Sequence, residues 1–264
     1  MYEEFYGLRE KPFSRTPDPR FLYQSRKHAE ALARLQLAVE EQDIILLTGD
    51  IGCGKTTLSR ALIDSLDARY YPVLIINPRL SSSQLLGLVA LRLGMPDESR
   101  SKHGLLEGIN GKLYELSEAG RHTTLIIDEA QLIPDKAAFE ELRLLTNFQL
   151  DDRNLLSLVL LGQPELRERL SRKPYRALRQ RVGLTYHLGP LDGQETREYV
   201  THRLRVAGRE EMLFDDSALS VLYRHSGGVP RRINILAGNA LFEGFGKGAE
   251  IITEEIVDDV AIEG

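Results

Sequence analysis

Short, continuously apolar runs recur along the first two thirds of this chain, and they constrain its fold more than any other feature. The runs are IILLT (44–48), VLIIN (73–77), TTLIID (123–128), LLSLVLLG (155–162) and, more weakly, LTYHL (184–188). Segments with apolar residues at helical spacing separate them, beginning with residues 25–42, where Ser25 is a plausible N-cap. Such alternation is typical of a mainly parallel sheet covered by helices on both faces. We therefore expect a three-layer α/β domain over residues 25–191.

The remainder of the chain has a different pattern. After GPLDG (189–193) no apolar strand run recurs, and four segments, mostly with polar starts and glycine ends, indicate helices. We expect a small all-helical lid domain over residues 192–264. At the other end of the chain, prolines at 12, 17 and 19 disfavour regular structure. We predict that residues 1–24 form an ordered, extended arm.

The bulk composition excludes several classes of protein. A formal charge of −5 gives no general electrostatic reason to expect nucleic acid or an anionic membrane as a partner, although a local basic patch is compatible with it. The single cysteine excludes an internal disulfide, and the six scattered histidines offer no zinc spacing. No apolar run approaches the ~18 residues of a membrane span, and the acidic, aromatic N-terminus is unlike a secretion signal. We expect a cytoplasmic protein.

The segment GDIGCGKT (49–56) matches the phosphate-loop pattern GxxxxGK[ST]. In such a loop the backbone amides turn towards the phosphates, Lys55 meets the β and γ oxygens, and the Thr56 hydroxyl can ligate Mg²⁺. A chance glycine turn is the alternative, which the strand before the loop and the helical pattern after it disfavour. We expect Cys53 to be a small tolerated residue rather than a redox switch. The predicted nucleotide-binding residues of this loop are Gly49, Asp50, Ile51, Gly52, Cys53, Gly54, Lys55, Thr56 and Thr57.

The third apolar run ends in two acids, Asp128 and Glu129. Asp128 is placed to hold Mg²⁺ through water, and Glu129 to orient and deprotonate an attacking water. A surface acid pair is the alternative, but hydrolysis needs such a pair at the carboxyl ends of parallel strands. The sequence thus predicts Thr56 and Asp128 as metal-binding residues, and Lys55 and Glu129 as catalytic ones.

Gln163 directly follows the fourth apolar run. This position is at the sheet edge where a γ-phosphate or the attacking water would lie, so we predict that Gln163 senses the γ-phosphate and takes part in catalysis. A loop amide that caps the next helix is the alternative.

Seven basic residues lie within positions 167–181, against one acid. We expect Arg172, Arg176 and Arg179 to share one helical face. The run can supply an arginine finger to a neighbour's nucleotide or a stripe that binds nucleic acid, and a solvated helix face is the third interpretation. Arg181, next to the fifth apolar run, is explained least well by a solvated face.

The segment GGVPRRIN (227–234) opens a helix with Pro230 in its first turn and two adjacent arginines, Arg231 and Arg232. Because the helix dipole disfavours cations at this end, we expect at least one of them to have an anionic partner. A nucleotide would be such a partner, and a structural salt bridge is the alternative.

Together these motifs resemble those of the AAA+ ATPases, and more closely those of the ExeA/GspA branch, whose members include secretion- and pilus-associated ATPases. The resemblance covers nearly the whole chain, from FYGLREKPFSRTPDPRFLYQS and HAEAL through LLTGDIGCGKTTL, LIIDEAQ, LVLLGQPEL and LRQRV to GGVPRRIN. The phosphate loop alone is generic, whereas the proline-rich arm, GQPEL and GVPRRIN together are specific.

The resemblance implies a P-loop AAA+ domain followed by a helical lid, with ATP and Mg²⁺ as cofactors. It implies that Arg181 is the arginine finger, with Arg179 as the second candidate, and that Arg231 is the lid's sensor arginine. Such proteins commonly assemble as rings, so a homo-oligomer with shared nucleotide sites is implied as well. The resemblance also implies that the arm and the start of the following helix flank the adenine through Phe21, Tyr23 and His28.

Two functions stay open on these residues. The first is an ATPase that drives assembly of a secretion or pilus apparatus with protein partners, cytoplasmic or peripheral at the inner membrane. The second is a DNA-binding switch similar to the transposition ATPases, which the basic run supports and the charge of −5 disfavours. ATP as a mere structural clamp is disfavoured by the intact Lys55, Asp128 and Glu129. Secretion-type relatives usually carry a membrane span and a peptidoglycan-binding segment after the ATPase. Residues 1–264 show neither, so we expect them not to bind the cell wall directly.

Overall fold

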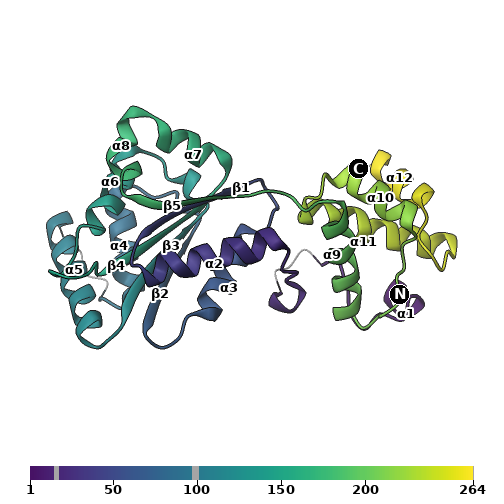
Figure 1. Cartoon of the computed structure of the whole chain (residues 1–264), viewed down its shortest axis with the longest axis horizontal. Helices are drawn as coiled ribbons and strands as arrows, with labels where there is room; N and C mark the ends of the chain where they lie inside the picture. The colour runs from purple at the N-terminus through teal and green to yellow at the C-terminus, as the bar shows by residue number, and fades with distance from the viewer. Residues whose placement is uncertain (15–17, 97–100, 264) are drawn as a thin grey trace. The chain divides into compact units, whose positions relative to one another are not determined.

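The computed structural model describes residues 1–14, 18–96 and 101–263 (Figure 1). The chain divides into two compact units. The sheet unit comprises residues 28–50 and 58–188, and the helical unit comprises residues 1–27, 51–57 and 189–264. Residues 15–17 of the predicted arm and Gly264 of the predicted lid lie outside the described residues. The domain boundaries predicted at residues 24 and 191 stay predictions.

The sheet unit is built on five parallel strands, which confirms the fold that the apolar runs predict. The strands are β1 (Ile44–Gly49), β2 (Tyr70–Ile76), β3 (His122–Asp128), β4 (Leu156–Gly162) and β5 (Val182–Leu188), in the order β2-β3-β4-β1-β5. The register pairs Ile76 with Asp128 and Thr48 with Gly162, so the carboxyl ends of the strands meet at one edge. β2 ends before the predicted Asn77, because that residue takes a left-handed backbone, φ 56°.

Helices cover both faces of this sheet (Figure 1). One face is covered by α4 (Ser82–Arg92), α5 (Lys102–Glu118) and α6 (Lys136–Leu145). Their apolar side chains share a core with alternate strand residues such as Leu46, Ile75 and Leu125. The other face is covered by α2 (Arg26–Glu40) and α3 (Lys55–Ser65). The chain between β4 and β5 forms two short helices, α7 (Pro164–Ser171) and α8 (Arg176–Arg179).

The helical unit contains α9 (Gly193–Val206), α10 (Asp216–Ser226), α11 (Pro230–Lys247) and α12 (Glu254–Glu263). Asp192 and Asp215 accept hydrogen bonds from the first turns of α9 and α10, and Gly227 and Gly248 end α10 and α11 in the left-handed conformation. These are the polar starts and glycine ends that indicate helices in the sequence. Among the described residues, every helix falls short of the length or the apolarity that crossing a bilayer requires.

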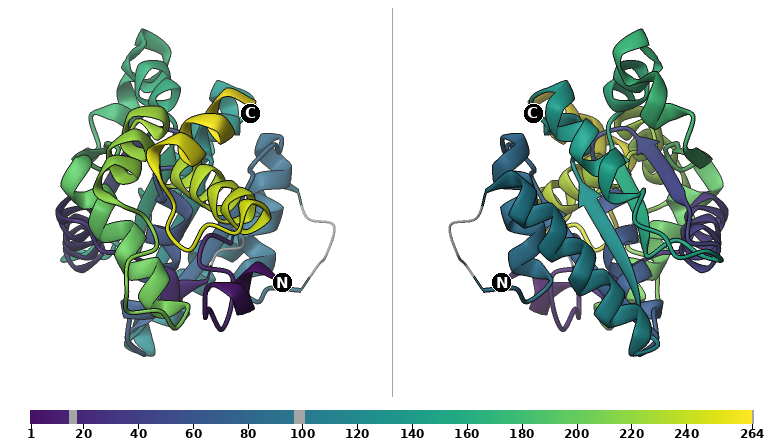
Figure 2. Two further views of the ribbon diagram at one scale, coloured as in Figure 1. Left: turned by 90° about the vertical axis from the view of Figure 1, so that its right-hand side faces the viewer. Right: turned by 90° about the vertical axis from the view of Figure 1, so that its left-hand side faces the viewer.

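The N-terminal segment packs onto these helices. A short helix, α1 (Tyr2–Phe5), contacts α11 (Figure 2). The rings of Phe5 and Phe245 meet edge to face there, with centres 5.5 Å apart. Farther along, Phe13 and Phe21 are buried in the same apolar core as Leu204 and Leu222 of the helical unit. The described part of the arm is therefore ordered by apolar burial, as predicted. It is not extended throughout, because Tyr2–Phe5 form α1 and Pro19–Phe21 form a 3-10 turn, for which the fixed φ of proline is suited.

A buried guanidinium also fixes the arm to α9. Arg203 is 6% exposed and donates to the carbonyl oxygens of Pro12 (2.5 Å) and Ser14 (3.4 Å). It also donates to the Tyr199 hydroxyl, at 2.9 Å, and its guanidinium carbon lies 4.7 Å from the centre of the Phe21 ring. One side chain thus satisfies backbone carbonyls that irregular structure leaves without ladder partners.

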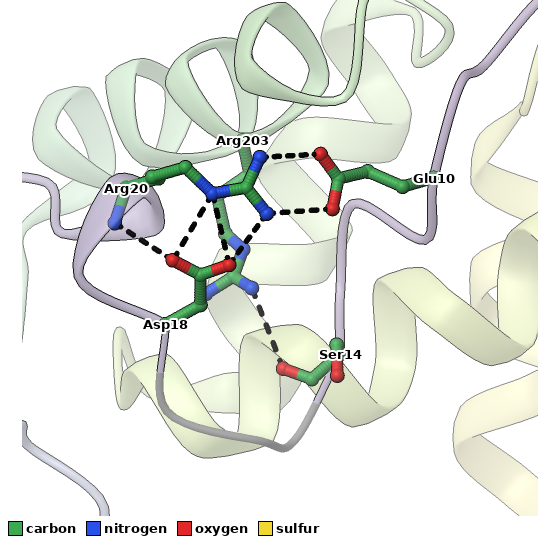
Figure 3. Close-up of polar contacts among 5 residues, drawn as sticks. All are labelled: Glu10, Ser14, Asp18, Arg20 and Arg203. Carbon is green, nitrogen blue, oxygen red and sulfur yellow. Dashed lines mark hydrogen bonds and ion pairs between the residues drawn. The ribbon is translucent and has the colours of Figure 1, made fainter.

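Arg20 also holds two parts of the arm together through ion pairs (Figure 3). The guanidinium of Arg20 lies between the carboxylates of Glu10 and Asp18, with nitrogen–oxygen distances of 2.9 and 2.6 Å. Hydrogen bonds from Arg20 hold the pKa of the Asp18 carboxyl below its usual range. Because these groups are exposed, we expect them to set the path of the arm rather than to contribute much stability.

Candidate active site

The predicted phosphate loop follows β1 directly and leads into α3. Gly52 (φ +87°) and Gly54 (φ +98°) both take backbone conformations that side chains disfavour. Lys55, the first residue of α3, is 5% exposed, and Cys53 is fully buried. A glycine turn that ends at a helix N-terminus presents N–H groups to an anion. The residues of this loop therefore fit the phosphates of a nucleotide.

The predicted sensor arginine lies beside this loop, within the helical unit. The N–H of Arg231 donates to the carbonyl oxygen of Gly52 at 3.3 Å. A Cβ atom on Gly52 would come within 2.6 Å of the Arg231 Cβ and 3.2 Å of a Val229 methyl. The close approach of α11 to the loop therefore requires glycine at position 52. The side chains of Arg231 and Arg232 are exposed, and Pro230 is in the first turn of α11, as the sequence predicts.

The predicted acid pair lies at the end of β3. Asp128 is the last residue of the strand and is fully buried, and its Oδ1 accepts the N–H of Glu129 at 2.9 Å. Glu129 takes a left-handed backbone, φ 56°, which residues other than glycine seldom adopt. Strained backbone of this kind is concentrated at functional sites.

Two amide side chains converge on the Glu129 carboxylate. Gln131 and Gln163 both donate from Nε2 to Oε2 of Glu129, at 2.5 and 3.2 Å. The Oε1 of Gln131 in turn accepts the backbone N–H of Gln163 at 3.1 Å, which closes a ring of hydrogen bonds. Gln163 occupies the N-cap position of α7, but its side chain makes no capping bond. The side chain hydrogen-bonds to Glu129 instead of capping the helix.

Gln131 is the functional candidate that sequence reasoning missed. A Cβ atom on Gly162 would lie 2.8 Å from Gln131 Oε1 and 2.6 Å from a Leu166 methyl. The glycine that ends β4 therefore leaves the space in which the Gln131 amide fits. The only signal in the sequence is the position of Gln131 two residues after Glu129 in the segment LIIDEAQ.

The basic run at 167–181 does not form one helix, so the predicted common face of Arg172, Arg176 and Arg179 is wrong for Arg172. α7 ends at Ser171, and Arg172 has an extended backbone with ψ 150°. The break coincides with Pro174, which cannot continue a helix begun upstream because its ring clashes with the preceding turn.

Two arginines of this run are held by the fold. Arg169 donates to the carbonyl oxygens of Ile133 and Pro134, and its guanidinium carbon lies 5.0 Å from the centre of the Phe139 ring. The half-buried Arg181 donates from Nη1 to the Thr146 hydroxyl at 2.8 Å. Arg179 is exposed on α8. The finger role of Arg181 or Arg179 stays a prediction.

The three residues expected beside the adenine have different surroundings. Phe21 is 5% exposed and stacks on Arg203, so its ring is already part of the core. The hydroxyl of Tyr23 donates to Glu198 at 2.5 Å, and burial together with this carboxylate raises the pKa of Tyr23. His28 is buried on the first turn of α2.

A five-stranded parallel sheet with a glycine-rich loop after β1 and an acid pair at the end of β3 defines a P-loop nucleotide-binding protein of the AAA class. A family model described as an AAA domain matches residues 38–170. The chain is 40% identical over 266 residues to General secretion pathway protein A of Aeromonas hydrophila, a match that covers 100% of this chain and 48% of that protein. The chain belongs to the family of AAA ATPases that includes General secretion pathway protein A, and it spans about half the length of that relative.

Several solved structures share this fold at low sequence identity. The Aeropyrum pernix ORC2 protein matches 96% of this chain and 71% of its own, with a TM-score of 0.70 and 18% identity. A chain of Drosophila ORC bound to DNA matches 99% of this chain and 65% of its own, with a TM-score of 0.72 and 20% identity. RuvB, the Holliday junction branch migration motor of Thermotoga maritima, matches 90% of this chain and 67% of its own, with a TM-score of 0.57 and 22% identity.

Proposed function

We propose that this protein binds MgATP through residues 49–57 and hydrolyses it, with Glu129 orienting and deprotonating the attacking water. The observation that carries the proposal is the ring of hydrogen bonds formed by Glu129, Gln131 and Gln163. A general base must be held within hydrogen-bond reach of one water, and two amide donors on one carboxylate oxygen leave the other oxygen to accept its proton.

The phosphate loop and the acid pair are proposed to act on the same nucleotide. The loop is continuous with β1, and the acid pair lies at the end of β3. Because only β4 separates these two parallel strands, the loop and the acid pair both follow the carboxyl edge of the sheet. Thr56 and Asp128 would hold Mg²⁺, which neutralises charge on the phosphates when it is bound. Lys55 and Arg231 would contact the phosphates from the loop and from α11. Gln163 would contact the γ-phosphate and transmit its presence to Glu129 through the hydrogen bond between the two side chains.

We further propose that the protein acts as a homo-oligomer, in which Arg181, or Arg179, completes the nucleotide site of a neighbouring copy. The bond of Arg181 to Thr146 supports this role, because a finger must be held rigidly to stabilise a transition state. The family membership supports a role in assembling a secretion or pilus apparatus at the inner face of the membrane, in contact with protein partners.

The test is the rate of ATP hydrolysis as a function of protein concentration. We expect specific activity to rise with concentration for the wild type and to fall by about 10³-fold in Arg181→Ala, as for other arginine fingers. Arg172→Ala, at an exposed position of the same basic run, is the matched control and should keep wild-type activity. Activity that is independent of concentration and unchanged by Arg181→Ala would exclude the shared site.

A DNA-binding switch is the second candidate function, and one observation favours it. A group of cations on α7, α8 and the turn between them is exposed: Arg167, Arg172, Lys173, Arg176 and Arg179. Cations concentrated on one short segment are the electrostatic footprint of phosphate binding.

This candidate is tested by duplex DNA in the same hydrolysis assay. Stimulation by duplex, together with an affinity that falls steeply as salt rises, would favour the DNA-binding switch over the assembly ATPase. Hydrolysis that duplex leaves unchanged, with no binding at 50 mM salt, would exclude it.

A further inference from the structure

A polar pocket of about 190 Å³ lies at the amino edge of the sheet, opposite the edge where Asp128 ends β3. Its walls are the turns that precede β2, β3 and β4, together with the end of α2. Because β3 contains seven residues, the pocket is about 20 Å from Asp128 along the strand. It is therefore separate from the chemistry proposed for the carboxyl edge.

The strand order concentrates positive charge in this pocket. Arg69, Arg121 and Arg153 each belong to the turn before one of three neighbouring strands, and all three line the pocket. Glu40 is the one acid among the described lining residues. His122 also lines the pocket, but burial lowers its pKa to about 4, so it is neutral at physiological pH. Three guanidinium groups thus stand against two carboxylates, those of Glu40 and of Asp67, which pairs with Arg69.

The described residues around Arg121 offer few acceptors for the N–H groups of its guanidinium. Its guanidinium carbon lies 4.8 Å from the centre of the Tyr71 ring, and its Nη2 makes only a long bond, 3.4 Å, to the carbonyl oxygen of Tyr70. The Nε of Arg121 is buried and has no acceptor among the described residues. A donor without an acceptor is unfavourable, and an anion in the pocket would accept from the outer N–H groups of this guanidinium, which make one long bond to the described residues.

We propose that this pocket binds a small oxyanion, a phosphate or a dicarboxylate, between the guanidinium groups of Arg121, Arg69 and Arg153. The planar guanidinium presents paired N–H groups that match carboxylate and phosphate oxygens. A volume of about 190 Å³ is large enough for an ion of this size with part of its hydration shell. Arg69 is 76% exposed and pairs with Asp67 at 2.7 Å, which places it at the mouth of the pocket.

The test is calorimetric titration of the full chain with inorganic phosphate and, separately, with succinate, at constant ionic strength. A saturating non-hydrolysable ATP analogue with Mg²⁺ is present throughout, so that phosphate cannot occupy the phosphate loop. We expect binding of at least one probe, weakened about 10-fold or more by Arg121→Ala and by Arg153→Ala. The control is Arg92→Ala, which removes an exposed arginine that does not line the pocket and should leave binding unchanged.

Each outcome separates the sources of the anion. Binding of phosphate alone identifies a phosphate-bearing ligand, and binding of succinate identifies a carboxylate. Arg121 also packs on Tyr71, so Arg121→Ala can disturb folding. Arg153 is exposed, so the effect of Arg153→Ala on binding can be attributed to the loss of its charge. Absence of binding by both probes, or equal binding by wild type and Arg153→Ala, would overturn the proposal.

Discussion

Gln131 Nε2 lies 2.5 Å from Oε2 of Glu129, and the other end of the same amide accepts the N–H of Gln163. One side chain thus ties the turn after β3 to the turn after β4. Gln131 is a positioning residue in this arrangement, because it acts through Glu129. The orientation of the proposed base therefore depends on residues that two different strands bring together.

Replacing either amide should lower turnover rather than nucleotide binding. We expect Gln131→Ala and Gln163→Ala each to reduce kcat for ATP by about 10- to 100-fold with KM changed less than about 3-fold, because a misplaced base loses rate, not affinity. The double variant should lose less than the product of the two, since both amides bond one carboxylate. Steady-state kinetics checks this, with the exposed Gln149→Ala as control. A KM effect with unchanged kcat would contradict the positioning role.

Glycine at position 52 should be essential for the loop. Gly52→Ala forces a side chain into φ +87° and within 2.6 Å of Arg231 Cβ, so we expect a loss of about 1–2 kcal/mol in stability and at least 10-fold in affinity for nucleotide. Fluorescent-nucleotide titration and urea unfolding measure the two effects. Gly111→Ala is the matched control: it lies in α5 with open space around it, and it should stabilise the protein by about 1 kcal/mol.

Arg203 should contribute far more to stability than its neighbour Arg205. Arg203→Ala removes the donor to Pro12 and Ser14 and the stack on Phe21, and we expect a loss of about 2–4 kcal/mol in the free energy of unfolding. Arg205 is 58% exposed and pairs with Glu210 on the surface, so Arg205→Ala should change stability by no more than about 0.5 kcal/mol. Equal losses in chemical unfolding would show that Arg203 does not anchor the arm.

His122 should make stability depend on pH between about 4 and 6.5. Burial lowers its pKa from 6.5 to about 4, so in this range the unfolded chain binds a proton that the folded chain does not. Stability should rise with pH across this window by up to about 3 kcal/mol and then stay level. Urea unfolding from pH 4.5 to 7.5 measures the slope, which His122→Asn should reduce and the exposed His103→Asn should not. Part of the slope should persist, because burial also lowers the pKa of His202. Identical slopes in all three proteins would refute the assignment.

The central strands of the sheet could be predicted from sequence because both of their faces are buried. Burial on both faces favours apolar side chains at nearly every position, so β1 and β4, apart from Thr48 and Ser157, appear as apolar runs in the sequence and as fully buried strands in the structure. The phosphate loop is predictable for a second reason: a backbone that turns its N–H groups towards an anion needs glycine, and φ is positive at both Gly52 and Gly54.

Other features depend on contacts between distant residues. The helix break at Arg172, the Gln131 bond to Glu129 and the Arg203 bonds to the arm involve polar groups whose partners cannot be read from periodicity. The same holds for the amino-edge pocket, whose arginines at 69, 121 and 153 are neighbours only because β2, β3 and β4 are adjacent.

The sequence by itself determined the parallel α/β fold, the helical character of residues 193–263 and the position of the phosphate loop, because local burial and backbone requirements are written in consecutive residues. Only the tertiary structure decided which polar side chains meet, because the order of strands in the sheet, β2-β3-β4-β1-β5, brings together turns that are tens of residues apart in the chain.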